Sequence, residues 1–421
     1  MTTVAPTLAE ASRGRWVSGV LHVVMDELDR EGAVVSLGQA TAAALADTGL
    51  VEVRPERGGA WRLLPCGKVG AVLAPGLQVQ VTPKEKVGLS KLIFLLGYAR
   101  DPGFRPEDVA GDDESELWPA LAESLARLAE RALGRGVLQG YRTMDESLRT
   151  VRGRIRIGDQ LTRRPGQMVP IEVTYDEFTV DIPENRVLRA ALRRMLTVPA
   201  VDAKTRSRLA HLDGRLDGVQ LLRLREQYPS WLPTRLNDRY HAALRLSEVI
   251  LRNCSAEPGP GGVQIAAFVV PMWKVFEDFV ATALTEGLRR YPGVTRTQYR
   301  RSLDVPLPGK AEGEVSMRID IAHLVGGKPV AVFDAKYKAA DSSGRYPNAD
   351  HYQVLAYCTA LNLDRGWLIY AGGSGGSVER RIRNSPVRVV EYPLDLSVRP
   401  GELVAQLVEL GRDAWAVQRA G

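Results

Sequence analysis

Cysteine is scarce in this sequence, and no two cysteines lie close together. Only Cys66, Cys254 and Cys358 occur among 421 residues, and none belongs to a CxxC pair. Structural zinc sites are usually built from such closely spaced pairs, so the sequence offers no basis for one. A sparse, odd number of cysteines is typical of a reducing compartment, and we therefore expect a cytoplasmic protein without a disulfide framework.

Long apolar runs and a nucleotide-binding loop are also missing. The longest apolar stretches, around Leu92–Leu96 and Val263–Val270, are far shorter than the ~20 residues that a membrane helix needs. Residues 1–13 lack the basic and then apolar order of a signal peptide. Cys66-Gly67-Lys68-Val69 has a GK pair but not the GxxxxGK[ST] spacing. We expect no membrane partner and no nucleotide hydrolysis by this chain itself.

The net charge and the length of the chain limit its possible partners and its number of domains. The net charge is +6, the isoelectric point is about 9.2, and charged residues make up 25% of the chain. This mild positive excess is compatible with a polyanion partner, but it is also common in proteins that bind no nucleic acid. A chain of 421 residues is too long for one compact core, which predicts two or three domains.

The order of periodic segments predicts an α+β multidomain protein with three parts. Residues 1–110 read as a small α+β module, residues 111–255 as a mainly helical domain with a basic loop, and residues 256–421 as an α/β domain with a central mixed sheet flanked by helices. The Pro- and Gly-rich Ser255–Gly262 is the candidate linker. Strands of the first part are predicted at Val34–Ser36, Val51–Arg54, Trp61–Leu64, Val69–Leu73 and Leu77–Thr82.

The central part begins with a leucine-lined helix and contains a basic stretch. Asp181 and Glu184 have the spacing of a capping box around Pro183, which predicts a helix start. Further helices are predicted over Thr205–Leu216 and Asn237–Arg252. The basic stretch, predicted to be irregular, contains Arg142, Arg149, Arg152, Arg154, Arg156, Arg163 and Arg164.

The third part contains a hairpin with three charged residues at related positions. Two strand-like segments, Ser316–Leu324 and Ala331–Lys338, are joined by a short glycine-containing loop. If the turn is centred on Gly327, Asp320 faces Asp334, because both lie seven positions from the centre. Facing residues share one side of a sheet, with Cβ atoms ~4.5–5.5 Å apart. Lys336, two residues beyond Asp334, projects from that side as well.

This combination suits phosphate chemistry. Two facing carboxylates repel each other, and a hard cation with oxygen ligands removes that cost. Mg²⁺, for which Mn²⁺ is a possible substitute, can polarise a phosphoryl oxygen and activate water. A lysine beside it adds positive charge where the transition state develops negative charge. We therefore predict that Asp320 and Asp334 bind metal and that Lys336 assists the reaction.

Two flanking helices add candidate residues. In the helix predicted over Trp273–Arg290, Glu277 borders the apolar face beside Phe276 and could reach the metal. In the next helix, Gln353 and Tyr357 lie at positions i and i+4, on one side, and could contact DNA or hold the catalytic lysine.

Each of these residues also has a plainer interpretation. A D-x-K triplet is usually part of a solvated strand face, and only the register with Asp320 favours catalysis here. Glu277 alone would read as a surface carboxylate, and Gln353 with Tyr357 as a helix edge. His323 lies on the same strand as Asp320 with opposite parity, which indicates a structural role.

At this point the sequence resembles the PD-(D/E)xK nucleases. The series Glu277, Asp320, Asp334-Ala335-Lys336 and Gln353-x-x-x-Tyr357 is similar to the branch of that superfamily with a trailing QxxxY. The chain departs from the pattern in two ways, because no proline precedes Asp320 and the second acid is Asp. Neither departure removes a ligand.

Further segments resemble the McrC family, the nuclease subunits of McrBC-type, modification-dependent restriction systems. The resemblance spans roughly residues 60–370. The segments are Val69–Val72, Val79–Lys84, Arg152–Ile155, Tyr175–Arg186 and Asp334–Lys338. Asn185 and Arg186, at the end of the fourth segment, are interpreted as structural.

The resemblance implies a definite activity and partner. McrC-like proteins cut double-stranded DNA with Mg²⁺, and only together with an McrB-like AAA+ GTPase hexamer that recognises modified cytosine. It implies metal ligation by Asp320, Asp334 and Glu277, catalysis by these residues with Lys336, and a DNA-binding or site-supporting role for Gln353, Tyr357 and Lys338. It also implies docking on the ring through the first two parts, insertion of a segment into its pore, and stimulation of GTP hydrolysis.

The pore-inserted segment is assigned here to the basic stretch, although an arginine-lined DNA or surface face explains that stretch equally well. The candidate residues are Arg152, Arg154, Arg156, Arg163 and Arg164.

Two other functions remain open. The chain could be a non-catalytic activator and organiser of the AAA+ ring, or a standalone RecB-like nuclease. The long N-terminal half argues against the second alternative, because a bare nuclease fold needs only about 150 residues.

Overall fold

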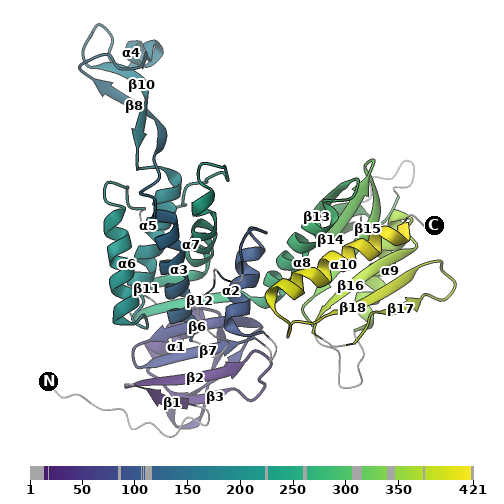
Figure 1. Cartoon of the computed structure of the whole chain (residues 1–421). Helices are drawn as coiled ribbons and strands as arrows, with labels where there is room; N and C mark the ends of the chain where they lie inside the picture. Colours follow the sequence, from purple (N-terminus) through teal and green to yellow (C-terminus); the bar gives the residue numbers. More distant parts are fainter. Residues whose placement is uncertain are drawn as a thin grey trace. The chain divides into compact units, whose positions relative to one another are not determined.

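The computed structural model divides into two compact units. One comprises residues 1–120 together with 253–421, and the other comprises residues 121–252. The mixture of helices and several sheets confirms the prediction of an α+β multidomain protein (Figure 1). The structure describes residues 14–17, 19–83, 87–105, 107, 109, 116–222, 226–258, 263–305, 315–338, 347–372 and 375–418.

Two sheets form the N-terminal part of the first unit. The larger has the strand order β1-β2-β7-β6-β12-β11, and the smaller has the order β3-β5-β4. All five strands predicted here are confirmed to within one residue at each end, whereas β1 and β2 were not predicted. The elements are β1 (Gly14–Val17), β2 (Val20–Asp26), β3 (Ala33–Ser36), α1 (Gln39–Asp47), β4 (Val51–Pro55), η1 (Arg57–Gly59), β5 (Ala60–Pro65), β6 (Lys68–Ala74), β7 (Leu77–Thr82), α2 (Leu89–Tyr98), β11 (Cys254–Pro258) and β12 (Gln264–Pro271).

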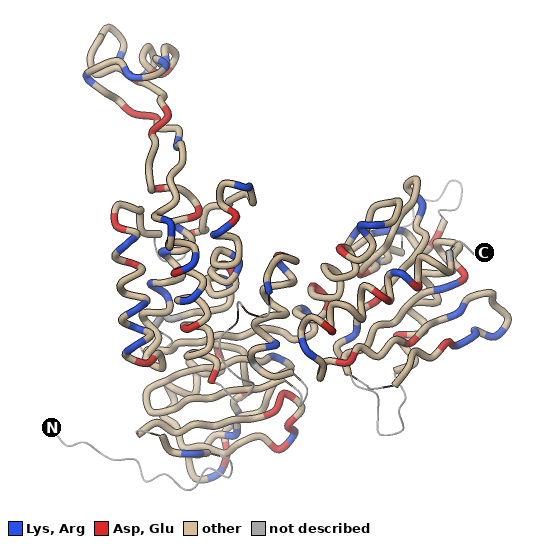
Figure 2. The backbone as a smooth tube through the Cα atoms, viewed as in Figure 1, with Lys and Arg blue, Asp and Glu red and all other residues tan. Residues whose placement is uncertain are grey.

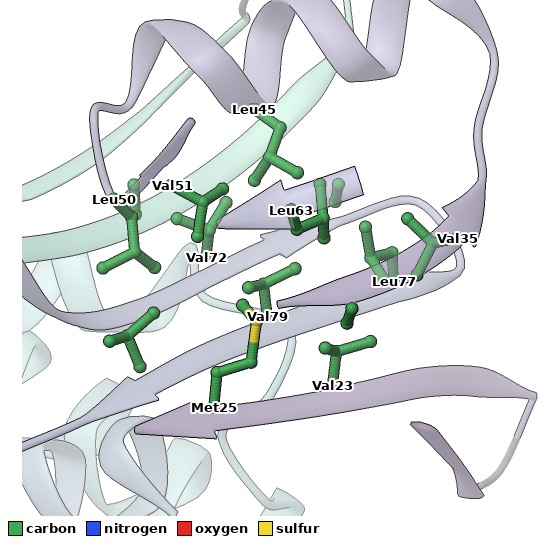
Figure 3. Close-up of a cluster of buried hydrophobic side chains, with 14 of the residues drawn as sticks. Val23, Met25, Val35, Leu45, Leu50, Val51, Leu63, Val72, Leu77 and Val79 are labelled. Carbon is green, nitrogen blue, oxygen red and sulfur yellow. The ribbon is translucent and has the colours of Figure 1, made fainter. Parts of the chain in front are cut away.

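A shared aliphatic core joins the two sheets and α1. Val23 and Met25 of β2 are buried at alternate positions, as a strand with one covered face requires. Figure 3 shows these side chains and Val79 of β7 near Leu45 of α1 and Leu63 of β5. Burial of each large aliphatic side chain contributes about 1.5–3 kcal/mol, so this cluster stabilises the module substantially.

The boundary predicted at residue 255/256 differs from the structure. β11 and β12 extend the N-terminal sheet, because β12 pairs with β6 and β11 pairs with β12. Residues 264–271 therefore belong to this sheet rather than to the C-terminal sheet. The first half of the predicted linker, residues 255–258, belongs to β11, while its residues 259–262 lie outside the described residues, as do the predicted boundary at 110/111 and Lys84.

The pairing of β12 with β6 depends on one glycine. Gly70 adopts a φ of +146° opposite Val269, and a Cβ atom there would overlap the Phe268 carbonyl oxygen. Only glycine both tolerates this backbone conformation and allows so close an approach of the neighbouring strand. A strand that is remote in the sequence can therefore complete the sheet.

The second unit is mainly helical, as predicted for the central part, but its basic stretch is regular. β8 and β10 form a long antiparallel ribbon, with β9 on the other side of β10 and α4 between β9 and β10 in sequence. Figure 1 shows this ribbon leading away from the helices of the same unit. The elements are α3 (Leu117–Leu133), β8 (Gly140–Leu148), β9 (Arg154–Ile155), α4 (Ile157–Arg163), β10 (Ile171–Thr179), α5 (Pro183–Leu196), α6 (Ala203–Arg215), η3 (Asp238–Tyr240) and α7 (His241–Asn253).

The capping box predicted at the start of α5 is wrong. The N-cap residue is Ile182, and it makes no capping hydrogen bond with its side chain. Asp181 instead accepts hydrogen bonds from Arg186 Nε at 2.7 Å and from the backbone nitrogen of Gln220 at 2.8 Å. These partners lower the pKa of Asp181, with the Arg186 hydrogen bond as the largest cause. A nearby guanidinium is a stronger partner for a carboxylate than an exposed helix N–H.

The C-terminal part of the first unit contains a six-stranded mixed sheet of order β13-β14-β15-β16-β18-β17. The β15–β16 and β16–β18 pairs are parallel, and the other pairs are antiparallel. Helices α8 and α10 pack together, and α9 packs on β15, β16 and β18. The elements are α8 (Met272–Leu288), β13 (Val294–Ser302), β14 (Ser316–Val325), β15 (Lys328–Lys336), α9 (Asn348–Leu361), β16 (Arg365–Ala371), β17 (Val378–Arg381), β18 (Arg388–Leu394) and α10 (Pro400–Gln418).

Replacing Gly70 with alanine tests the β6–β12 junction. We expect Gly70→Ala to destabilise the N-terminal sheet by about 2–3 kcal/mol, because both the backbone conformation and the contact with Phe268 become unfavourable. Hydrogen exchange of the β12 amides and the melting temperature would measure the effect. Gly76→Ala is the control, since Gly76 also has a positive φ, of +74°, but has no atom within 4 Å of the added Cβ. An equal effect of the two substitutions would contradict this explanation.

Candidate active site

The hairpin of β14 and β15 has the predicted register, although its turn differs from the prediction. Gly326 and Gly327 both have positive φ, of +57° and +79°, as a two-residue type I′ turn requires. The turn is therefore centred between the two glycines rather than on Gly327. A register shift after His323 moves the pairing by one residue, so that Ile321 pairs with Phe333.

Asp320 and Asp334 lie one position beyond that last pair, where the ladder between the two strands ends. Continuing the register by one residue places the two aspartates opposite each other. Asp320 Oδ2 accepts a hydrogen bond from the backbone nitrogen of Ala335 at 3.1 Å. The Asp320 carboxylate therefore links the strands at the point where backbone pairing stops.

Asp334 is a buried acid with little compensation. Only 1% of its surface is exposed; Lys336 Nζ is a close partner of Oδ2, at 2.6 Å, and Oδ1 accepts no hydrogen bond from the described part of the chain. Burial, and then the negative charge of Asp320, raise the pKa of Asp334 to about 7. Buried polar atoms in folded proteins are nearly always hydrogen-bonded, so an unsatisfied carboxylate points to a ligand or a catalytic role.

Lys336 supplies the one close positive charge. Its Nζ lies 2.6 Å from Asp334 Oδ2 as an ion pair. Burial is the largest single influence on the pKa of Lys336 and lowers it, but the combined attraction of Asp334, Asp320 and Asp350 outweighs burial and leaves that pKa above its usual value. The lysine therefore stays protonated beside the two aspartates, as the sequence predicted.

Glu277 is buried on α8 close enough to Asp320 for their charges to interact. Burial, and then the charge of Asp320, raise the pKa of Glu277. Its carboxylate accepts a hydrogen bond from Gln298, and Lys274 Nζ lies 3.5 Å from Oε1. The predicted position beside the apolar face of α8 is confirmed, but this carboxylate already has two partners.

The donor set that a hard cation could use is centred on Asp320 and Asp334. Within the described residues, no three His, Cys, Asp or Glu side chains form a metal-binding group, so Glu277 does not join the two aspartates in such a cluster. Mg²⁺ commonly binds through one or two carboxylates, with water and substrate phosphate completing the octahedron. The two opposed aspartates, one with a buried oxygen that has no hydrogen-bond partner among the described residues, fit that requirement.

Gln353 and Tyr357 hold the Asp320 strand rather than the catalytic lysine. Gln353 Nε2 donates to the Tyr357 hydroxyl at 2.6 Å, and that hydroxyl donates to the Arg318 carbonyl at 2.9 Å. Burial raises the pKa of Tyr357, which keeps the hydroxyl proton available for donation. The pair therefore contacts β14 two residues before Asp320 and makes no hydrogen bond to Lys336, while its contact with DNA stays a prediction.

Lys338 is held by an acid that the sequence did not single out. Its Nζ lies 2.9 Å from Asp350 Oδ1, and Tyr370 donates to Asp350 Oδ2 at 3.3 Å. The negative charge of Asp350 also contributes to the raised pKa of Asp334. The signal for Asp350 was its position on α9, three residues before Gln353 and hence on the same helix face.

Gln298 was also missed, and no sequence signal marked it. It lies on β13 between the residues that pair with Ile319 and Ile321, and its φ is +51°. Its amide joins two elements of the site, because it donates to Glu277 and accepts a hydrogen bond from Arg318 Nε.

Two residues that the sequence marked as structural have structural contacts. His323 is buried, with Nδ1 2.9 Å from Thr295 Oγ1 and Nε2 3.1 Å from the Pro292 carbonyl. Asn185 Nδ2 donates to the backbone carbonyls of residues 138 and 180.

The family comparison agrees with this geometry. A family model described as "McrBC 5-methylcytosine restriction system component" matches residues 66–371, well over half of the chain. The chain belongs to this family. A search of curated proteins found no match.

Solved structures of McrBC assemblies resemble the chain. One is a refined half-complex from a tetradecameric assembly of Thermococcus gammatolerans McrB AAA+ hexamers with bound McrC. The similarity has 18% identity and a TM-score of 0.54, and it covers 90% of each chain. A cryo-EM structure of the Thermococcus gammatolerans McrBC complex matches with 18% identity and a TM-score of 0.40, over 65% of this chain and 89% of that chain. At this identity, the first similarity supports the fold.

The arginines considered for pore insertion in this McrBC-family chain are mostly paired with acids. Arg164 Nε lies 3.2 Å and Arg163 Nη1 lies 3.8 Å from the Glu172 carboxylate, and Arg156 forms an ion pair with Asp159. Residues 140–180 contain seven arginines and six acids, and Figure 2 shows both signs of charge in this ribbon. The stretch is therefore less basic than its arginine content suggested.

Arg154 differs from the other candidates. Arg152 packs its guanidinium over the Tyr175 ring, 4.0 Å from the centroid. Arg154 is exposed on β9 and forms no ion pair with an acid in the described ribbon. It is the candidate whose charge is most accessible to a partner.

A search of the described helices found none with the length and apolar character needed to cross a membrane.

Replacing Asp334 with asparagine should stabilise the metal-free protein at pH 8. Because the folded pKa of Asp334 is raised to about 7, ionisation costs stability progressively from about pH 4 upward, and the full cost is present above pH 7. We expect Asp334→Asn to raise the free energy of unfolding by about 1–3 kcal/mol at pH 8 in EDTA and to leave it almost unchanged at pH 4. Thermal melting at both pH values would measure this.

The control for the pH prediction is Asp413→Asn, a change at an exposed position on α10, which should leave stability nearly unchanged at both pH values.

Addition of Mg²⁺ gives a second comparison. It should raise the melting temperature of the wild type but not that of Asp334→Asn. Lower stability of Asp334→Asn at pH 8 would show that the ionised carboxylate is satisfied in the metal-free protein.

Proposed function

We propose that this chain is the Mg²⁺-dependent DNA endonuclease subunit of an McrBC-type restriction system. In this proposal it cleaves methylcytosine-containing double-stranded DNA together with an AAA+ GTPase ring and stimulates the ring's GTP hydrolysis. The main observation behind this proposal is the buried Asp334, opposite Asp320 and paired with Lys336, whose Oδ1 accepts no hydrogen bond from the described residues. A purely structural carboxylate that is almost fully buried would be expected to have partners for both oxygens.

The chain's own residues divide the work of phosphodiester hydrolysis. Asp320 and Asp334 would hold Mg²⁺, which when bound polarises a phosphoryl oxygen and lowers the pKa of water. Lys336, kept protonated by Asp334, places positive charge where the five-coordinate phosphorus becomes negative. Asp320 is already oriented by the Ala335 N–H, and Tyr357 fixes the strand that carries it. Glu277 would act through Asp320 or as a further ligand.

The partner follows from the family and from the similar assemblies, in which McrB AAA+ hexamers carry bound McrC. The absence of a phosphate loop in this sequence fits a division of labour in which the partner hydrolyses GTP. The β8–β10 ribbon would enter the ring and present Arg154 there. Pairing of the other arginines with acids within the ribbon would keep it rigid.

Plasmid cleavage tests the nuclease. Methylcytosine-containing plasmid would be incubated with Mg²⁺, the purified chain, and the AAA+ protein encoded beside it with GTP. We expect cleavage only in the complete mixture, and Asp334→Ala should lower its rate at least roughly 100-fold while leaving GTP hydrolysis stimulated. Asp413→Ala, far from the aspartate pair in sequence and exposed, serves as the control.

Other outcomes would identify the alternatives. Cleavage by the chain alone would indicate a standalone nuclease. Unchanged cleavage by Asp334→Ala would remove the proposed site. If no mixture cleaves DNA but GTP hydrolysis is still stimulated, the chain acts as a non-catalytic activator.

Arg154 tests the ring contact. We expect Arg154→Ala to reduce stimulation of the partner's GTP hydrolysis several-fold, because its charge is not neutralised by a described acid of the ribbon. Arg163→Ala is the control, since Glu172 already partners that side chain. Normal stimulation combined with weaker DNA binding by Arg154→Ala would instead assign the ribbon to a DNA-binding face.

A further inference from the structure

Two arginines face one another beside the candidate active site. Arg300 of the edge strand β13 pairs directly with Arg318 of β14, and both are exposed. Side chains directly opposite each other on neighbouring strands lie ~4.5–5.5 Å apart at Cβ, and like charges in such a pair destabilise it. Within the described residues, neither arginine forms an ion pair with an acid, so the repulsion is uncompensated there.

The other edge of the same sheet shows how such a pair is normally balanced. Arg381 of β17 also lies opposite an arginine, Arg388 of β18. There Glu379 accepts Arg388 Nη1 at 3.2 Å and lies 3.0 Å from Arg365 Nη2. One of the two facing arginines at that edge, Arg388, therefore has an acid partner, whereas within the described residues neither Arg300 nor Arg318 has one.

Gln298 orients one of the two facing arginines. Its side-chain oxygen accepts a hydrogen bond from Arg318 Nε, while its amide nitrogen donates to Glu277. Gln298 has a φ of +51°, a conformation that L-residues rarely adopt and that is concentrated at functional sites. Since Nε is the bonded atom, the terminal nitrogens of Arg318 remain free to form a fork toward an anion.

We propose that Arg300 and Arg318 bind a backbone phosphate of the DNA strand whose scissile phosphate lies at Asp320 and Asp334. This inference rests on the proposed nuclease function and assigns the part of the site that holds the substrate strand. Arg318 is two residues before Asp320, and two residues of a strand span roughly 7 Å. A phosphate held by Arg318 would therefore lie close to the scissile phosphate on the same DNA strand. Arginine is suited to this contact because its planar fork matches phosphate oxygens.

The test replaces both arginines in the full-length chain, as Arg300→Gln/Arg318→Gln. Binding of a fluorescently labelled 30-base-pair duplex would be measured by anisotropy without divalent metal, from 20 to 200 mM salt. We expect the slope of log affinity against log salt to become less steep by about 1, because loss of one phosphate contact removes about one released counterion. The melting temperature without DNA should stay the same or rise, since the like-charge contact is gone.

The matched control is Arg381→Gln/Arg383→Gln, which removes the same charge from exposed positions at and beside β17. A wild-type slope in the Arg300/Arg318 variant, or an equal change in the control, would overturn the proposal.

A DNA cleavage assay shows whether a negative result concerns the phosphate site alone or the proposed nuclease function as well. In the complete mixture with the AAA+ protein, GTP and Mg²⁺, the Arg300/Arg318 variant should lose cleavage at a lower salt concentration than the wild type. Its stimulation of GTP hydrolysis should be unchanged. Wild-type cleavage by the variant at every salt concentration would refute the phosphate site and leave the nuclease intact. If the wild type neither binds nor cuts DNA, the nuclease function and this inference both fail.

Discussion

Asp320 and Asp334 lie opposite each other at the end of the β14–β15 ladder, and the repulsion between their carboxylates is the interaction that the other contacts of the site must offset. Two carboxylates brought together in a place that excludes water repel each other, and burial makes the repulsion stronger than in solvent. Two contacts offset part of this repulsion. The Ala335 N–H donates a hydrogen bond to Asp320, and the Lys336 ammonium forms an ion pair with Asp334. Such an arrangement is understandable when a cation and a phosphate complete it.

Several hydrogen bonds from outside the hairpin keep the two strands in this unfavourable arrangement. Tyr357 holds β14 from α9, and Asp350, also on α9, holds Lys338 two residues after the end of β15. Gln298 joins β13, β14 and α8 through one amide group. Because these bonds tie the hairpin to α9, β13 and α8, relaxation of the acids away from each other would require several elements to move together.

The sequence predicted what depends on local spacing. The register of Asp320 with Asp334 follows from the position of two glycines, and the error in the turn centre was cancelled by the register shift after His323. The strands of the N-terminal module were visible because glycine pairs and alternating residues marked their ends. β2 was missed because Val24 on its outer face is apolar too, which hides the alternation.

What depends on distant partners could not be predicted. The cap expected at Asp181 failed because Arg186 and Gln220 reach its carboxylate in the folded unit. The basic stretch read as irregular because the pairing of β8 with β10 joins segments separated by β9 and α4. Gln298 has an ordinary sequence context, and only its backbone conformation and contacts reveal its place in the site.

The pairing of β12 with β6 has a consequence for synthesis of the chain. Val72 pairs with Ala267, so the N-terminal sheet stays two strands short, without β12 and β11, while the whole helical unit between them is being made. Until β12 emerges, the edge of β6 presents unpaired backbone groups, the feature that promotes aggregation of nascent sheets. The C-terminal sheet, which carries Asp320 and Asp334, is translated after β12. A ribosome that stops early would therefore release an open N-terminal sheet without the aspartate pair.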